Sequence, residues 1–165
     1  MMLLFHTGIV DRQNPKLPID ITSDRQRVTT LDLIARRFPG IWIVGAHLGN
    51  PDYAWAGELA RWNPNILFDL TGSSLIKKQD DYTFFNSIFW WSRIVSPHTT
   101  KTGRDAWEKL IFGSDADSRA GEADEFDREV ERYHKLLTTC GVSQHVQEMI
   151  FKGTMWRLLH TRPTD

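Results

Sequence analysis

The sequence predicts an α/β fold with a parallel sheet, and three observations lead to this prediction. Four short apolar runs are continuous instead of alternating, which is typical of strands buried on both faces; they cover residues 3–5, 41–44, 66–68 and 110–112. Stretches with helical periodicity separate the runs. Each run is followed by a polar side chain near a glycine. We therefore expect repeated strand and helix units within one domain spanning residues 1–165.

Two helices are predicted beside the second strand. An apolar stripe at helical spacing covers residues 31–38 and stops at a Pro-Gly pair just before the strand. The next helix is expected to begin at Pro51, after an asparagine N-cap, and to end before Asn63. These boundaries give the order helix, strand, helix, strand.

The rest of the chain is predicted to be mainly helical. Aromatic and aliphatic residues recur at threes and fours before a polar loop, and a charged amphipathic segment is closed by Gly141. Ser143 is the expected N-cap of a final helical pair that ends near His160. The predicted segments are a long helix over 75–95, a loop over 97–103, a helical turn over 104–108 and a helix over 125–140.

Composition excludes several partners. Twenty Lys and Arg against 21 Asp and Glu give a formal charge of −1, so no basic field attracts nucleic acid or anionic lipid. No apolar run approaches the ~20 residues that cross a bilayer, and the first residues lack the features of a signal peptide, so we expect a cytoplasmic protein. Cys140 is the only cysteine and is expected to be buried and unreactive. Any metal ion must therefore be held by His and carboxylate side chains.

The polar residues that follow the strands are the candidate site. They occur in the segments FHTG, AHLG, DLTG and GSDA as His6, His47, Asp69 and Asp115. In a (β/α)8 barrel the active site lies at the carboxyl ends of the strands, where such side chains converge. His6, His47 and Asp115 are predicted to hold zinc or another divalent metal ion, whose bound water attacks a small-molecule substrate while Asp115 moves the proton.

Each of these residues also has a structural interpretation. A histidine at the end of a strand is often hydrogen-bonded without binding metal, and an Asp in a Gly-Ser-Asp turn is often a cap. For His6, His47 and Asp115 the repeated placement favours the metal site. For Asp69 we leave two alternatives open, substrate contact and hydrogen bonding at the strand end.

Longer segments resemble a known family. LIARRFPGIWIVGAHLGNP, NPNILFDLTGS, KLIFGSDA and the closing GVSQ to MWRLL are similar to the amidohydrolase-related family that includes aminocarboxymuconate-semialdehyde decarboxylase. The resemblance implies that His6 is a metal ligand, that His47 binds metal or acts as acid and base, and that Asp115 ligates metal and moves protons. It implies hydrolysis of a C–N or C–O bond in a small cyclic or aromatic acid, amide or lactone, or nonoxidative decarboxylation, usually with zinc.

The chain departs from that family's pattern in one respect. It has no His-x-His pair and only four predicted strands, which correspond to strands five to eight, whereas a full barrel takes ~250 residues. The expected fold is thus the C-terminal half of a TIM-barrel-like metal-dependent hydrolase. We expect a truncated reading frame, with two alternatives: closure of the barrel by another half, including a homo-oligomer, or a noncatalytic remnant. Such a remnant would bind a partner through its open sheet edge and the aromatic residues 89–91.

Overall fold

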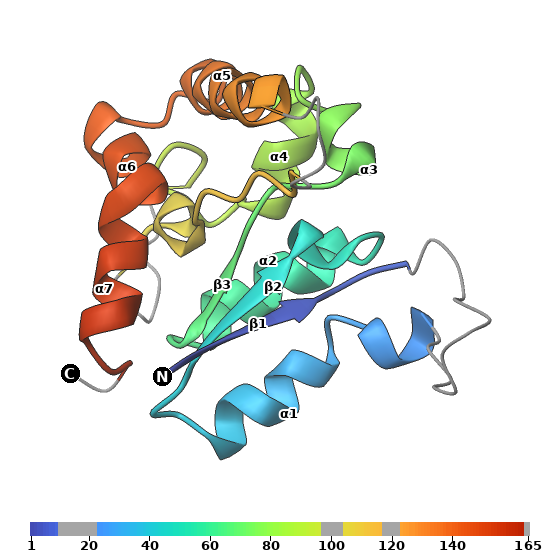
Figure 1. The fold of residues 1–165 in the computed structure, drawn as a ribbon, viewed down its shortest axis with the longest axis vertical. Helices are drawn as coiled ribbons and strands as arrows, with labels where there is room; N and C mark the ends of the chain where they lie inside the picture. Colours follow the sequence, from blue (N-terminus) through green and yellow to red (C-terminus); the bar gives the residue numbers. More distant parts are fainter. Residues whose placement is uncertain (10–22, 97–103, 117–122, 164–165) are drawn as a thin grey trace.

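The computed structural model describes residues 1–9, 23–96, 104–116 and 123–163. Its centre is a three-stranded parallel sheet of β1 (Met2–His6), β2 (Trp42–Ala46) and β3 (Ile66–Phe68), in that order (Figure 1). The strands form where the first three apolar runs predict them, and the prediction of a parallel α/β arrangement is confirmed. The register pairs His6 with Ala46, so β1 and β2 end side by side.

The fourth predicted strand does not form. The run 110–112 joins the sheet only through an isolated bridge between Leu110 and Phe68 and one hydrogen bond from the Ile111 amide to the Phe68 carbonyl. The next amide, that of Phe112, donates to the carbonyl of Ile150 instead, so the ladder stops after one step. The run still lies beside β3, because the fully buried Lys109 donates to the carbonyls of Asn63 and Pro64 just before that strand.

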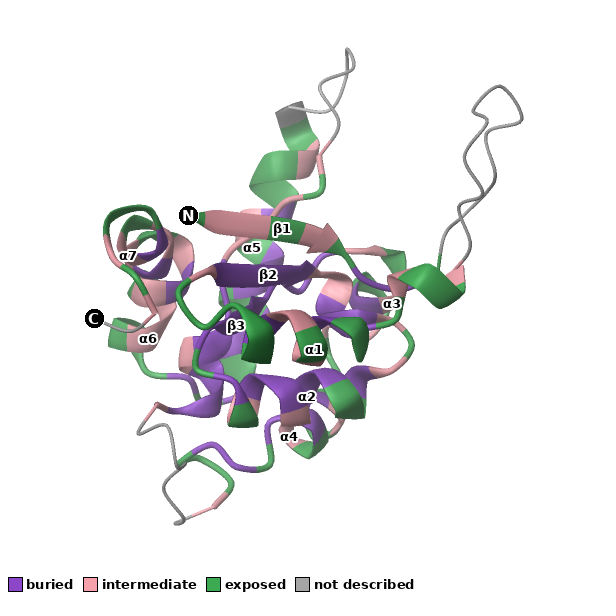
Figure 2. Ribbon diagram, turned by 90° about the horizontal axis from the view of Figure 1, so that it is seen from below, coloured by how far each residue is buried: buried purple, intermediate pink, exposed green. Residues whose placement is uncertain are grey.

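Helices cover one face of the sheet. α1 (Thr30–Arg37) and α2 (Tyr53–Trp62) precede and follow β2, and their buried side chains pack with alternate residues of the strands in the main core. Ile43, Ile66 and Phe68 carry the sheet's side of this core. β2 is buried along its length while β1 lies at the edge with a half-exposed face (Figure 2). The helix predicted to start at Pro51 begins two residues later, at Tyr53.

The opposite face of the sheet is covered only in part. Trp42, Val44, Leu67 and Ile111 form a smaller core on this face with Leu158 of α7 (Thr154–His160). The indole of Trp42 also donates to the carbonyl of Thr161, which fixes α7 at the amino ends of the strands. Leu4, further along β1, remains 66% exposed. This face of the sheet is therefore covered at the amino ends of the strands and remains exposed at Leu4 of the edge strand.

The remaining helices agree partly with the predictions. The long helix expected over 75–95 is divided into α3 (Ser73–Ile76) and α4 (Tyr82–Ile88), because the Asp81 side chain accepts from the Phe84 amide and starts a new helix. α5 (Ala123–Thr139) is followed by Gly141 at φ 76°, and Ser143 caps α6 as predicted. The other helical segments are η1 (Ser23–Gln26), η2 (His47–Gly49), η3 (Ala106–Lys109), α6 (Gln144–Glu148) and the π-helical η4 (Met149–Gly153).

None of the helices in the described ranges has the length and apolar character needed to span a lipid bilayer.

The single cysteine, Cys140, lies just after α5 and is 3% exposed. Burial raises the pKa of its thiol from 9.0 to about 11. The thiol is therefore buried and protonated at neutral pH, as predicted.

Alkylation of Cys140 tests this environment. A rise of two units in the thiol pKa lowers the thiolate fraction about a hundredfold, and only the thiolate reacts. Iodoacetamide at about pH 8 should therefore modify the folded protein at least about a hundred times more slowly than the urea-unfolded chain. Because the raised pKa favours the folded state below pH 9.0, this contribution to stability should disappear as the pH rises from 9.0 through about 11. Equal rates for the folded and unfolded protein would contradict the buried position.

Candidate active site

Two histidines meet at the carboxyl ends of β1 and β2. His6 is the last residue of β1, and His47 is the first residue after β2. Their ring centroids are 4.8 Å apart and the rings meet edge to face. The parallel register explains the pairing, because it places the two strand ends next to each other. The two imidazoles therefore lie next to each other at the carboxyl edge of the sheet.

A cavity of about 200 Å³ lies at this edge, and His6, His47 and Asp115 all line it. Asp115 reaches it from the segment after the 110–112 run and is exposed. The rest of the wall comes from the segments that follow the three strands, namely Ile9, Asn50, Tyr53, Thr71, Gly72, Ser73, Ser74 and Leu75. The structure thus brings all three residues predicted as metal ligands to one cavity.

The backbone at this edge is strained at two of the candidate residues. His47 has φ 64° and Asp115 has φ 53°, in the left-handed region that non-glycine residues rarely adopt. Such conformations cost of order 1–3 kcal/mol each and persist only where the surroundings impose them. Thr7, directly after His6, supplies part of that support: its hydroxyl donates to the Ala46 carbonyl and accepts from the Gly49 amide at 3.1 Å. Thr7, the residue after His6, therefore holds the turn that carries His47.

Asp69 and Thr71 support His47 from the end of β3. Oδ1 of Asp69 accepts from the amide of His47 at 2.8 Å, from the amide of Thr71 at 3.0 Å and from the hydroxyl of Thr71 at 2.7 Å. The same hydroxyl lies 2.8 Å from Nδ1 of His47. Asp69 is 6% exposed and is absent from the residues that line the cavity. Of the two alternatives for Asp69, hydrogen bonding at the strand end is the one that the geometry displays; substrate contact stays a prediction.

Helix α5 fixes the backbone of Leu70, which lies between Asp69 and Thr71. The amide of Leu70 donates to the Tyr133 hydroxyl at 2.7 Å, and the Leu70 carbonyl accepts from Nη2 of Arg132 at 2.7 Å. Arg132 is itself paired with Glu129 at 2.6 Å, and Tyr133 is fully buried, which raises its pKa. Both polar groups of Leu70 are thus satisfied by side chains of one helix.

Burial at the cavity favours a neutral His6. Burial lowers its pKa below 6.5, and the neighbouring His47 lowers it further. A backbone hydrogen bond with Ile9 and the carboxylates of Asp115 and Asp69 act in the opposite direction without reversing the shift. At neutral pH the His6 imidazole therefore retains a lone pair, which is the form that binds a metal ion.

The donor set fits a metal ion in part. Two imidazoles side by side are suitable ligands for zinc and similar divalent ions. Within residues 1–9, 23–96, 104–116 and 123–163, however, no three His, Cys, Asp or Glu side chains lie close enough together to hold one. His6 and His47 fit as a ligand pair, whereas Asp115 shares their cavity without completing the group. The binding of one metal ion by all three residues stays a prediction.

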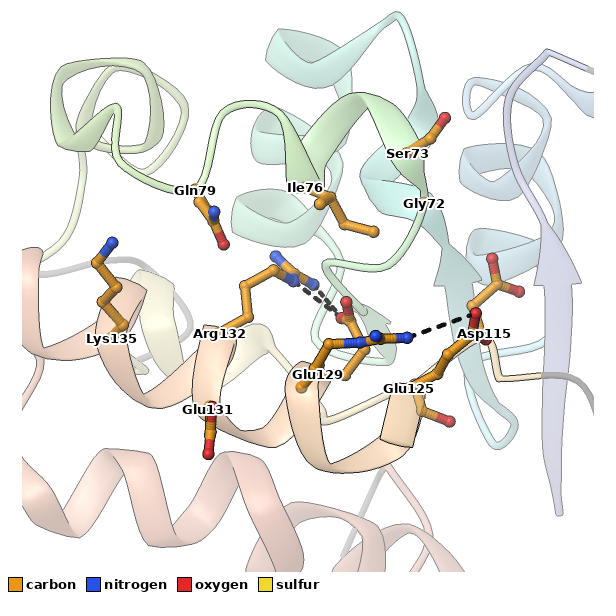
Figure 3. Close-up of a pocket in the computed structure, with 12 residues that line it drawn as sticks. Gly72, Ser73, Ile76, Gln79, Asp115, Glu125, Glu129, Glu131, Arg132 and Lys135 are labelled. Atoms are coloured by element: carbon orange, nitrogen blue, oxygen red, sulfur yellow. Dashed lines mark hydrogen bonds and ion pairs between the residues drawn. The ribbon is translucent and has the colours of Figure 1, made fainter. Parts of the chain in front are cut away.

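A larger cavity of about 520 Å³ adjoins the first and shares Gly72, Ser73 and Asp115 with it. Its other wall is α5, which contributes Arg128, Arg132 and Lys135 together with three glutamates (Figure 3). The cations are partly neutralised: Arg128 lies 3.8 Å from Glu125. This is a polar space beside Asp115 of a size suited to a small molecule.

Sequence reasoning found the side chains on the cavity but missed those that support them. Thr7, Thr71 and Tyr133 were not predicted. The two threonines occupy equivalent places in FHTG and DLTG, immediately before the glycine, and this repeated placement was the available signal. Nothing local to Tyr133 marks it, because its partner Leu70 lies 63 residues away.

Comparison with known proteins gives one family. The family model described as Amidohydrolase matches residues 4–160. No curated protein and no solved structure matches the chain. The matched range contains His6, His47, Asp69 and Asp115.

Replacement of Gly72 tests how tightly the strand ends pack. Gly72 has φ 98°, and a Cβ atom there would lie 3.1 Å from Nδ1 of His47. We expect Gly72→Ala to lower the free energy of unfolding by about 1–3 kcal/mol, measured by urea denaturation. Gly40→Ala is the control, because it has open space and no positive φ, and it should leave stability unchanged or raise it by about 0.4–1 kcal/mol. Equal effects of the two substitutions would contradict this account.

Proposed function

The chain belongs to the amidohydrolase family, and we propose that it is a metal-dependent hydrolase of a small cyclic or aromatic carboxylic acid, amide or lactone. The observation that carries the proposal is the pair of imidazoles, 4.8 Å apart, on a cavity that Asp115 also lines. This arrangement combines two nitrogen ligands with a carboxylate at the strand ends, where enzymes built from parallel strands and helices perform chemistry. The substrate class comes from the resemblance of the strand-end segments to that family.

In this proposal His6, His47 and Asp115 hold a divalent metal ion, by preference zinc. The ion, when bound, makes a water molecule acidic enough to attack a carbonyl carbon at neutral pH. The side chains of the chain do the rest. His6 contributes a ring from the end of β1 that is neutral at neutral pH. His47 contributes a ring that Thr71 contacts, from a turn whose backbone Asp69 and Thr7 hold in place.

Asp115 is the proposed proton carrier. Its carboxylate is exposed on the cavity and makes no hydrogen bond with any other described residue. The attacking water forms the new C–O bond and gives its proton to Asp115. The C–N or C–O bond then breaks, and the departing nitrogen or oxygen takes that proton. His47 is the second proposed acid and base on the same cavity.

The larger cavity supplies room for the substrate beyond the reacting bond. Arg128 lies on its wall and Asp115 at its border with the first cavity. A carboxylate of the substrate is therefore proposed to lie toward α5, with the scissile bond toward the two histidines. Decarboxylation would use the same side chains, and product analysis separates the two reactions.

Metal binding provides the first test. We expect the metal-stripped wild-type protein to take up about one equivalent of Zn²⁺ in calorimetric titration, and His6→Gln or His47→Gln to weaken binding at least about tenfold. His145→Gln is the matched control, because His145 is exposed on α6 away from the strand ends. Circular dichroism confirms that each variant folds.

The reaction is tested with a panel of cyclic amides, lactones and aromatic carboxylic acids. New carboxylic acid product that requires added Zn²⁺ and is lost in Asp115→Asn supports hydrolysis. Release of CO₂ would assign the decarboxylase reaction instead. Uptake of less than about a tenth of an equivalent of Zn²⁺ by the wild-type protein would overturn the metal-dependent proposal.

A further inference from the structure

We propose that Thr71 and Asp69 are positioning residues that fix the tautomer of His47, with the proton on Nδ1 and the lone pair on Nε2. The assignment rests on hydrogen-bond geometry at the end of β3. Its consequence for metal binding rests on the proposed function, but the tautomer itself does not.

The first step concerns the single proton of the Thr71 hydroxyl. The hydroxyl oxygen lies 2.7 Å from Oδ1 of Asp69 and 2.8 Å from Nδ1 of His47. A carboxylate can only accept, so the contact with Asp69 is favourable only if Thr71 donates its proton there. Two backbone amides also donate to the same Oδ1, which is the arrangement that suits a charged oxygen. The threonine proton is therefore committed to Asp69.

The second step follows for the imidazole. With its proton on Asp69, the Thr71 oxygen can only accept from His47, so Nδ1 must carry a hydrogen. In the neutral ring the other nitrogen, Nε2, then holds the lone pair. Nε2 makes no hydrogen bond with any residue in the described ranges, and His47 lines the cavity. The free nitrogen is thus the one available to a ligand.

The third step is rigidity. The segment that carries Asp69 and Thr71 is held by α5, because Tyr133 accepts from the amide of Leu70 and Arg132 donates to its carbonyl. These bonds keep the Thr71 hydroxyl beside the ring. The backbone of Gly72 also comes so close that an added Cβ would lie 3.1 Å from Nδ1. Rotation of the ring by half a turn would place a carbon atom against the Thr71 hydroxyl and lose the hydrogen bond.

The consequence is a preset ligand or base. A histidine that binds a metal ion commonly donates its other ring N–H to an oxygen, which fixes the tautomer and raises the basicity of the binding nitrogen. Asp69 and Thr71 would do this for His47 through one hydroxyl. A purely structural role, in which Thr71 only fills space, predicts no tautomer preference.

Nitrogen NMR of the wild-type protein distinguishes these roles. Protein labelled with ¹⁵N in its histidines is studied at about pH 8.5, where imidazoles are neutral. The His47 signals are assigned by their loss in His47→Gln. We expect Nδ1 of His47 to be protonated and Nε2 unprotonated in wild type and in Thr71→Ser, which keeps the hydroxyl. In Thr71→Val the Nδ1–H form should fall from the majority to the minority.

Thr161→Val is the control, because the Thr161 hydroxyl donates to the Arg157 carbonyl far from His47. It should leave the His47 signals unchanged. A wild-type ring protonated on Nε2, or a Thr71→Val spectrum identical to wild type, overturns the proposal. If Thr71→Val does not fold, the wild-type and Thr71→Ser spectra decide between the two outcomes.

Titration of the same samples with Zn²⁺ separates this proposal from the proposed function. If the ion binds, the Nε2 signal of His47 should shift more than its Nδ1 signal in wild type and in Thr71→Ser. If no ion binds while the Nδ1–H form is present, the positioning role stands and the metal-dependent function fails.

Discussion

The interaction on which the site depends is the set of hydrogen bonds to Oδ1 of Asp69. Where strands end, backbone amides lose their ladder partners and must find others. The amide of His47, after β2, donates to the carboxylate of Asp69, after β3, and this hydrogen bond bridges the ends of the two strands. Because the carboxylate also holds Thr71, the same oxygen controls both the backbone and the ring of His47. The left-handed conformation of His47 is stable only within this network.

The support extends outward in two directions. Toward β1, Thr7 bonds on both sides of His47, so the edge strand is tied to the turn by more than its ladder. Toward the last part of the chain, α5 binds Leu70 and thereby places Asp69 and Thr71. The candidate ligands line the cavity and are exposed or partly exposed, while the groups that orient them are buried. Such an arrangement is typical of sites whose geometry is set before a ligand binds.

How far the sequence predicts this structure differs between elements. The run 66–68 becomes β3 with unchanged limits, as expected for a continuous apolar segment in a strand buried on both faces. The run 110–112 looks the same but fails as a strand, since the Phe112 amide bonds to Ile150, a partner 38 residues away that no local pattern reveals. The positions of His6 and His47 at strand ends follow from the pattern. The hydroxyl of Thr71 between Asp69 and His47 does not, because it depends on the register between strands.

The three proposed ligands differ in the contacts that hold them. His47 is restrained through its amide and its ring, and His6 through a backbone hydrogen bond with Ile9. Asp115 is exposed, and its carboxylate has no partner within the described residues. A proton carrier must approach both water and leaving group, so freedom at this position agrees with its proposed role. The two imidazoles would then define the site, and the carboxylate would adjust to what they bind.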